Sequence, residues 1–132
     1  MDLVIDTSVL IAVLTSKPER AILVKQTRGA NLMAPAPVHW EVGNALAAML
    51  KRHRIQRRQV RQVLKAYGQI PIRYVDVDLG AALELAAEHG LYAYDAYVIA
   101  CARRQRCSLL SLDQSLIRAA TAAGVSILGV NE

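Results

Sequence analysis

The sequence predicts an α/β fold with a mostly parallel central sheet of about five strands and helices on both faces, giving three layers. Short, apolar, β-branched runs alternate along the chain with longer segments of helical periodicity. Such alternation is typical of a parallel sheet covered by helices. The 132 residues, 54% of them hydrophobic and 20% charged, suit one domain over residues 1–132 with a substantial core. No repeat, low-complexity tract or linker divides the chain.

The first half of the chain contains two expected strands and three expected helices. Asp6 ends the first apolar run with a charge, and Pro18 followed by Glu19 suits the first turn of a helix. Gly29 suits the end of that helix. The expected elements are a strand at 3–5, a helix at 9–14, a helix at 18–28, a short strand at 31–34 and a long helix at 38–53.

The second half continues the same alternation. A helix up to Tyr67 is followed by a break at residues 68–71, and Asp78 is placed to cap a later helix that Gly90 ends. The buried face of that later helix is expected to carry Leu79, Ala82, Leu83, Ala86 and Ala87. The remaining expected elements are a strand at 72–77, a nearly all-apolar helix at 91–106, a strand at 107–112, a helix at 114–123 and a last strand at 125–128.

The net charge of +5 favours an anionic partner, of which nucleic acid is the commonest. Between Lys51 and Lys65 the chain has seven Lys and Arg residues and no acid. Arg58, Arg61 and Lys65 fall on one helix face, opposite the apolar face. That basic face is either an ordinary solvated surface or a strip that follows phosphates, and local sequence leaves both interpretations open.

Several other classes of protein fit the sequence poorly. The two cysteines, Cys101 and Cys107, lack metal or redox spacing and are expected to be thiols in a reducing compartment. No apolar run approaches the ~20 residues of a membrane span, and no basic region precedes the first apolar stretch, so we expect a cytoplasmic protein without membrane contact. The histidines lack zinc-site spacing, and no phosphate-binding loop or serine-hydrolase motif is present.

Four acids stand beside apolar segments: Asp6, Glu41, Asp95 and Asp113. Alone, Asp95 and Asp113 suit helix caps and Glu41 suits an exposed helix position. Asp6 and Asp113 both follow buried strands, so they converge at the carboxyl edge of the sheet if those strands are neighbours. Clustered carboxylates repel one another, and a hard cation such as Mg²⁺ or Mn²⁺ removes that cost. We therefore expect all four acids to meet around a metal ion.

The same residues resemble the motifs of PIN domains, in particular those of VapC-type toxins from bacterial toxin–antitoxin (VapBC) pairs. The four matching stretches occur in the expected order along the whole chain: Val4-Ile5-Asp6-Thr7-Ser8, Trp40-Glu41-Val42-Gly43-Asn44-Ala45-Leu46, Tyr94-Asp95-Ala96 and Leu110-Ser111-Leu112-Asp113. One feature differs from some relatives, which carry a further acid one turn after the third motif. Val98 and Ile99 occupy those places here, which bears on whether a second metal ion is held.

The resemblance implies a PIN-like three-layer fold and a Mg²⁺- or Mn²⁺-dependent endoribonuclease. Asp6, Glu41, Asp95 and Asp113 would hold the ion, with Glu41 acting directly, through water or as a general base. Supporting hydrogen bonds would come from Ser8 and Ser111, with Thr7 beside them. The strip at Arg58, Arg61 and Lys65 would be a candidate track for RNA.

The resemblance also implies partners: a homodimer and a VapB-type antitoxin whose C-terminal segment covers the active site. Two alternatives remain open at the level of sequence. One is a PIN-type RNA-processing nuclease outside a toxin module. The other is a non-catalytic nucleic-acid-binding domain in which the acids are only caps. Tyr92, Tyr94 and Tyr97 could stack on bases, although packing in the core or at its rim is the commoner role of such side chains.

Overall fold

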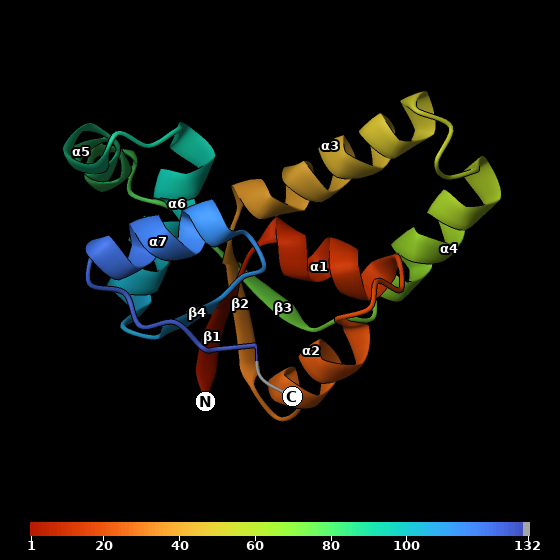
Figure 1. Ribbon diagram of the computed structural model, residues 1–132, viewed down its shortest axis with the longest axis horizontal. Helices are drawn as coiled ribbons and strands as arrows, with labels where there is room; N and C mark the ends of the chain where they lie inside the picture. The colour runs from red at the N-terminus through yellow and green to blue at the C-terminus, as the bar shows by residue number, and fades with distance from the viewer. Residues whose placement is uncertain (131–132) are drawn as a thin grey trace.

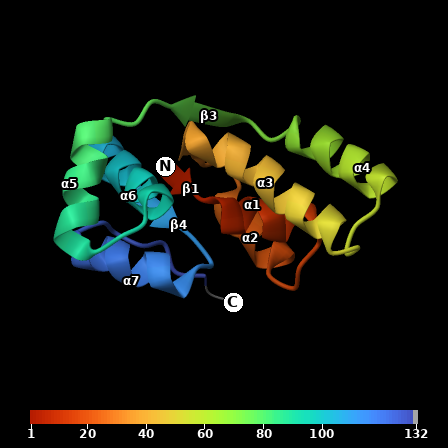
Figure 2. The same cartoon turned by 90° about the horizontal axis from the view of Figure 1, so that it is seen from above.

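A four-stranded parallel sheet, ordered β3-β2-β1-β4, forms the centre of the computed structural model, which describes residues 1–130. The strands are β1 (Asp2–Ile5), β2 (Asn31–Pro35), β3 (Ile72–Val75) and β4 (Ser108–Leu110). Figures 1 and 2 show one group of helices on one side of the sheet and a second group on the other. The first group is α1 (Thr7–Leu14), α2 (Arg20–Thr27), α3 (Pro37–Lys51) and α4 (Arg57–Tyr67); the second is α5 (Leu79–His89), α6 (Ala93–Gln105) and α7 (Gln114–Ala122). The predicted α/β architecture with helices on both faces is confirmed.

The core is built around β1, whose apolar residues Leu3, Val4 and Ile5 are at most 1% exposed. Helix α6 contacts three of the four strands, and its Ile99 is fully buried. Burying each such large aliphatic side chain contributes roughly 1.5–3 kcal/mol to folding. The core therefore fixes the strand that ends at Asp6 and the helix that begins near Asp95 in one rigid unit.

The fifth expected strand, at residues 125–128, is present only as a single parallel bridge between Leu109 and Ile127. The amide of Leu109 donates to the carbonyl of Ser126, and the carbonyl of Leu109 accepts from the amide of Leu128, each at 2.9 Å. In a parallel ladder, alternate residues turn their amide and carbonyl groups to opposite neighbours. Because β4 has three residues, only its middle residue, Leu109, turns its backbone amide and carbonyl toward the outer edge of the sheet. Pairing of β4 with residues 125–128 is therefore limited to one bridge.

Helix α5 differs from its predicted orientation. Asp78 caps it by accepting a hydrogen bond from the Gly80 amide at 3.1 Å, and Gly90 ends it in a left-handed conformation, as the sequence predicted. Its buried face, however, consists of Ala82 and Leu85, while Leu79 is 58% exposed and Leu83 is 51% exposed. The apolar stripe is wide enough for two orientations, and packing against α6 selects the one that buries Leu85. Within the described residues, no helix is both long and apolar enough to span a bilayer.

Candidate metal centre

The carboxyl edge of the sheet brings together residues that lie more than a hundred positions apart in the sequence. Strands β1 and β4 are neighbours, and Ile5 pairs with Leu110. The next residues, Asp6 and Ser111, consequently face each other, and Ser111 Oγ donates a hydrogen bond to Asp6 Oδ2 at 2.7 Å. The strand adjacency on which the convergence of Asp6 and Asp113 depends is therefore present.

Asp6 is the most confined of the four acids, with only 6% of its surface exposed. Its Oδ1 accepts hydrogen bonds from Ser8 Oγ at 2.6 Å and from the Val9 amide at 3.3 Å, so Asp6 also caps α1. Burial raises the pKa of the Asp6 carboxyl, and this effect is larger than the lowering by its hydrogen bonds. The nearby charge of Asp113 raises the pKa further. The result is a fixed carboxylate in a site where its negative charge is unfavourable without a cation.

The two serines connect Asp6 to the loop that carries Asp113. Each hydroxyl donates to Asp6 and accepts from a backbone amide: Ser8 Oγ from Leu112 at 2.9 Å and Ser111 Oγ from Asp113 at 3.0 Å. Asp113 itself caps α7, because its Oδ1 accepts from the amides of Ser115 and Leu116. The positions of Asp6 and Asp113 are thus set by one continuous hydrogen-bond network.

The importance of this network for stability can be tested by replacing Ser111 with alanine. The Ser111 side chain is 1% exposed, so its loss removes the hydrogen bond to Asp6 Oδ2 and the acceptor of the Asp113 amide, while Asp6 Oδ1 keeps its bonds from Ser8 and Val9. We expect the free energy of unfolding, measured in urea, to fall by roughly 1.5–3 kcal/mol, as for hydrogen bonds to charged groups. The exposed Ser115 offers a matched control, and Ser115→Ala is expected to change stability by less than about 0.5 kcal/mol. Equal stability of the two variants would contradict this account of Ser111.

Glu41, on α3, is partly buried and lies beside α1. Burial raises the pKa of its carboxyl, the Thr7 hydroxyl lowers it, and the charges of Asp6 and Asp95 raise it again. Thr7 Oγ1 is itself buried and, among the described residues, makes no hydrogen bond of normal geometry. A buried hydroxyl without a partner, beside a carboxylate, is a group that can serve a ligand or a bound water.

Asp95 lies in the first turn of α6, one turn after the Tyr92 cap residue. Its interpretation as a helix cap is not supported: within residues 1–130, no hydrogen bond joins its carboxylate to a backbone amide. Burial raises the pKa of the Asp95 carboxyl, and the charge of Asp113 raises it further. Of the two acids that, taken alone, suit helix caps, Asp113 caps a helix and Asp95 does not.

The four carboxylates form a closed ring of like charges. Asp6 interacts with Asp113, Asp113 with Asp95, Asp95 with Glu41, and Glu41 with Asp6. All four line one cavity of about 100 Å³, together with five other residues: Thr7, Ser8, Tyr94, Val98 and Leu116. Each water in the liquid occupies about 30 Å³, so the space suits an ion with some of its waters.

This donor set fits a hard divalent cation. Carboxylate oxygens are the ligands that Mg²⁺ and Mn²⁺ prefer, and Mg²⁺ usually keeps several waters. In the part of the chain that the structure describes, no three acidic, imidazole or thiol side chains have the close spacing of a preformed metal site. Asp6 and Asp113 are each held by helix-capping hydrogen bonds, and an ion bound partly through water does not require the four carboxylates to lie closer together.

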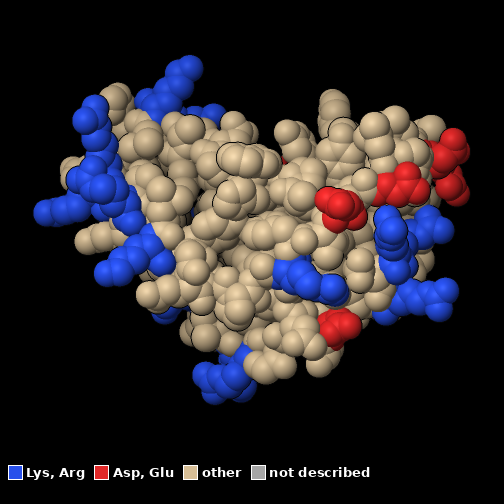
Figure 3. Space-filling view, turned by 180° about the vertical axis from the view of Figure 1, so that it is seen from behind, with Lys and Arg blue, Asp and Glu red and all other residues tan. Residues whose placement is uncertain are grey.

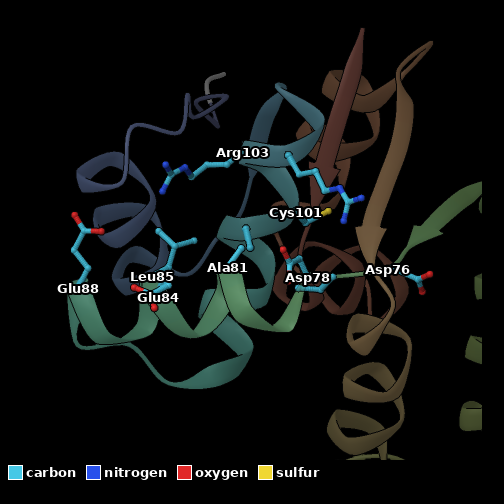
Figure 4. A pocket seen from close by; sticks show the side chains of 11 residues that line it. Asp76, Asp78, Ala81, Glu84, Leu85, Glu88, Cys101 and Arg103 are labelled. Carbon is cyan, nitrogen blue, oxygen red and sulfur yellow. The ribbon is translucent and has the colours of Figure 1, made fainter.

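A larger cavity, of about 620 Å³, lies between the loop after β3, α5 and α6, and contains none of the four acids (Figure 4). Its charged lining combines carboxylates and guanidinium groups, from Asp76, Asp78, Glu84, Glu88, Arg103 and Arg104. The Cys101 thiol also lines it, but burial raises the pKa of that thiol to about 12. Cys101 therefore stays protonated near neutral pH and is a poor nucleophile.

The basic strip is separate from the acidic cavity. Arg58, Arg61 and Lys65 are all exposed on α4, and the acidic cavity is lined from α1, α3, α6 and α7. Figure 3 shows Lys and Arg side chains gathered at the end of the molecule formed by α4 and the end of α3. The structure does not bring the strip and the four acids into one pocket.

Some of the aromatic residues around the acids are exposed. Tyr92 and Tyr94 are 88% and 54% exposed, so neither lies in the core, whereas Tyr97 is partly buried against the core and Tyr94 contacts its ring. Sequence reasoning gave no separate role to Trp40, which is 74% exposed. Its position in the helix could have indicated this exposure, because Trp40 lies outside the buried stripe formed by Val38, Val42 and Leu46.

Comparisons with known proteins agree with this architecture. The model of the PIN domain family matches residues 3–122. A search of curated protein sequences finds no significant match. Among solved structures, PAE2754 from Pyrobaculum aerophilum is similar with a TM-score of 0.70 and 23% identity, over 90% of this chain and 87% of that one.

Two further solved structures come from complexes. VapBC2 from Rickettsia felis, bound to a DNA fragment from its promoter, matches with a TM-score of 0.68 and 10% identity, over 97% of this chain and 98% of the other. A toxin–antitoxin complex from Klebsiella pneumoniae matches with a TM-score of 0.62 and 16% identity, over 98% of both chains. At these identities the likeness establishes a shared fold.

Proposed function

Because the chain belongs to the PIN domain family, we propose that it is a metal-dependent endoribonuclease and the toxin of a toxin–antitoxin pair. The observation that carries this proposal is the closed ring formed by Asp6, Asp113, Asp95 and Glu41 around one cavity. A ring of hard oxygen donors suits a divalent cation, and phosphodiester hydrolysis is one of the reactions that such cations assist in nucleases.

Mg²⁺ or Mn²⁺ is the cofactor in this proposal. Asp6, Asp95 and Asp113 would hold it, and Glu41 would hold it directly or through water. When bound, the ion supplies electrostatic stabilisation of the phosphate and makes water easier to deprotonate. All further roles fall to side chains of the chain itself.

Glu41 is suited to accept the proton of the attacking water. Burial and the charges of Asp6 and Asp95 raise its pKa, which increases its affinity for a proton. Unlike Asp6, Glu41 is not held as a helix cap. Ser8 and Ser111 act as positioning residues, because their hydroxyls orient the Asp6 carboxylate.

The remaining parts of the proposal concern substrate and partners. Arg58, Arg61 and Lys65 offer exposed charge for RNA phosphates away from the cavity. The similar folds in VapBC2 and in the Klebsiella complex support an antitoxin partner and a toxin role. The exposed Leu79 and Leu83 leave apolar surface that a homodimer or antitoxin would bury. The proposal includes a cytoplasmic location, where the protein would meet an RNA substrate and an antitoxin.

Cleavage of total RNA by the purified chain, free of antitoxin, tests the proposal. We expect discrete fragments with Mg²⁺ or Mn²⁺ and none with excess EDTA, because the acid ring requires the cation. Sequencing the fragment ends identifies the target. Growth arrest on expression, relieved by a gene product encoded next to it, supports the toxin role. Harmless expression of a cleaving enzyme favours RNA processing, and salt-sensitive RNA binding without cleavage under any metal contradicts the nuclease proposal.

A further inference from the structure

A shallow aromatic groove of about 340 Å³ borders the acidic cavity. It is lined by Ala36, Pro37, Trp40, Tyr94 and Tyr97. Tyr94 lines both spaces, since it also forms part of the wall of the acidic cavity. A group bound in the aromatic groove and a group held between the four acids therefore share the Tyr94 side chain as a wall.

The two exposed rings of the groove directly precede two of the acids in the sequence. Trp40 immediately precedes Glu41 on α3, and Tyr94 immediately precedes Asp95 on α6. Their side chains are 74% and 54% exposed, although burial of large aromatic side chains would stabilise the fold. Edge-to-face contacts orient them: Trp40 against His39 at 4.8 Å and Tyr94 against Tyr97 at 5.9 Å between ring centroids.

We propose that this groove binds an unpaired nucleobase of single-stranded RNA, next to the phosphodiester that is cut. The inference rests on the proposed nuclease function and specifies its substrate class. Every base has a face that stacks on aromatic side chains, whatever its identity. In duplex RNA the bases are stacked within the helix, whereas those of loops and single strands can be turned outward. The shared wall at Tyr94 places such a base beside the phosphate held at the acids.

A protein side chain is the other kind of group that fits an apolar groove. The position of the groove favours the nucleobase. Tyr94 lines both the groove and the cavity of the four carboxylates, where the proposed function places a phosphate, and a base is joined to its phosphate by one sugar. An aromatic or aliphatic side chain from another protein needs no such neighbouring phosphate site.

Trp40 is the only tryptophan of the chain, so its fluorescence reports on this groove alone. The experiment titrates the full chain with a short single-stranded oligoribonucleotide in EDTA, and repeats the titration with Mg²⁺ on the Asp6→Asn chain, both to prevent cleavage. We expect saturable quenching, because a stacked base quenches indole emission. An abasic oligonucleotide of equal length keeps the phosphates and lacks the bases, and we expect it to leave the emission unchanged.

Variants of the tyrosines separate stacking from general RNA affinity. Tyr94→Ala is expected to weaken oligoribonucleotide binding by about 5- to 150-fold, the effect of losing one base–aromatic stack. Tyr94→Phe keeps the ring and is expected to bind like the parent chain. Tyr92→Ala is the matched control, because Tyr92 is 88% exposed, close in sequence and outside the groove lining.

Each contrary outcome has a distinct meaning. Equal quenching by the abasic oligonucleotide, or unchanged binding in Tyr94→Ala, overturns the nucleobase site even if metal-dependent cleavage is observed. A change in Trp40 emission that follows protein concentration without RNA also overturns it, and identifies a second copy of the chain as the occupant. Base-dependent quenching without cleavage in any metal supports the groove while contradicting the nuclease proposal.

Discussion

Replacing Asp6 with asparagine is expected to abolish metal-dependent RNA cleavage. Asp6 is the most buried acid of the ring, and its carboxylate is fixed by Ser8, Ser111 and the Val9 amide. Residues that merely support metal ligands typically cost 10- to 100-fold in activity when mutated, so loss of a ligand itself should exceed about 100-fold. The measurement is the initial rate of fragment formation from total RNA in Mg²⁺ and in Mn²⁺.

Asp78→Asn provides a matched control for this experiment. Asp78 caps α5 much as Asp6 caps α1, and asparagine caps helices about as well as aspartate. Both substitutions remove one negative charge from a helix start, but only Asp6 lies in the acidic cavity. We expect Asp78→Asn to retain the parent rate. Cleavage by Asp6→Asn at the parent rate would remove Asp6 from the catalytic centre and leave it as a cap.

Replacing Leu109 with alanine is expected to produce the largest loss of stability among the changes considered. Leu109 is fully buried in β4, where it pairs with Val4 on one side and bridges to Ile127 on the other. Leucine-to-alanine changes in cores lower the free energy of unfolding by about 2–5 kcal/mol, through lost burial and the cavity that remains. Urea-induced unfolding, followed by circular dichroism, measures this loss.

Leu83→Ala is the corresponding control and tests the orientation of α5. The helical pattern placed Leu83 on the buried face, but the structure leaves it 51% exposed. We expect Leu83→Ala to change the free energy of unfolding by less than about 1 kcal/mol, well below the loss in Leu109→Ala. A loss in Leu83→Ala as large as that in Leu109→Ala would mean that α5 packs in the orientation that the sequence pattern predicted.

Features decided by local chemistry were predictable from the sequence. The apolar run 3–5, the charge at Asp6 that ends it, the caps at Asp78 and Asp113, and the helix end at Gly90 were all visible, because capping and strand formation depend on residues within one or two turns. The alternation of these segments was enough to predict a parallel sheet covered on both faces. The sequence therefore determined the order of the elements and the set of acids that follow or begin them.

The tertiary structure alone decided how these local pieces meet. Placing β4 beside β1 joins Ser111 to Asp6 across 105 positions, and no local pattern encodes that pairing. The same long-range packing chose the buried face of α5, reduced the strand at 125–128 to one bridge, and left Trp40 beside Tyr94 at the rim of the acids. Strand order and helix orientation are set by how the whole core packs. An amphipathic segment specifies that one of its faces is buried, but it does not specify which other element that face packs against.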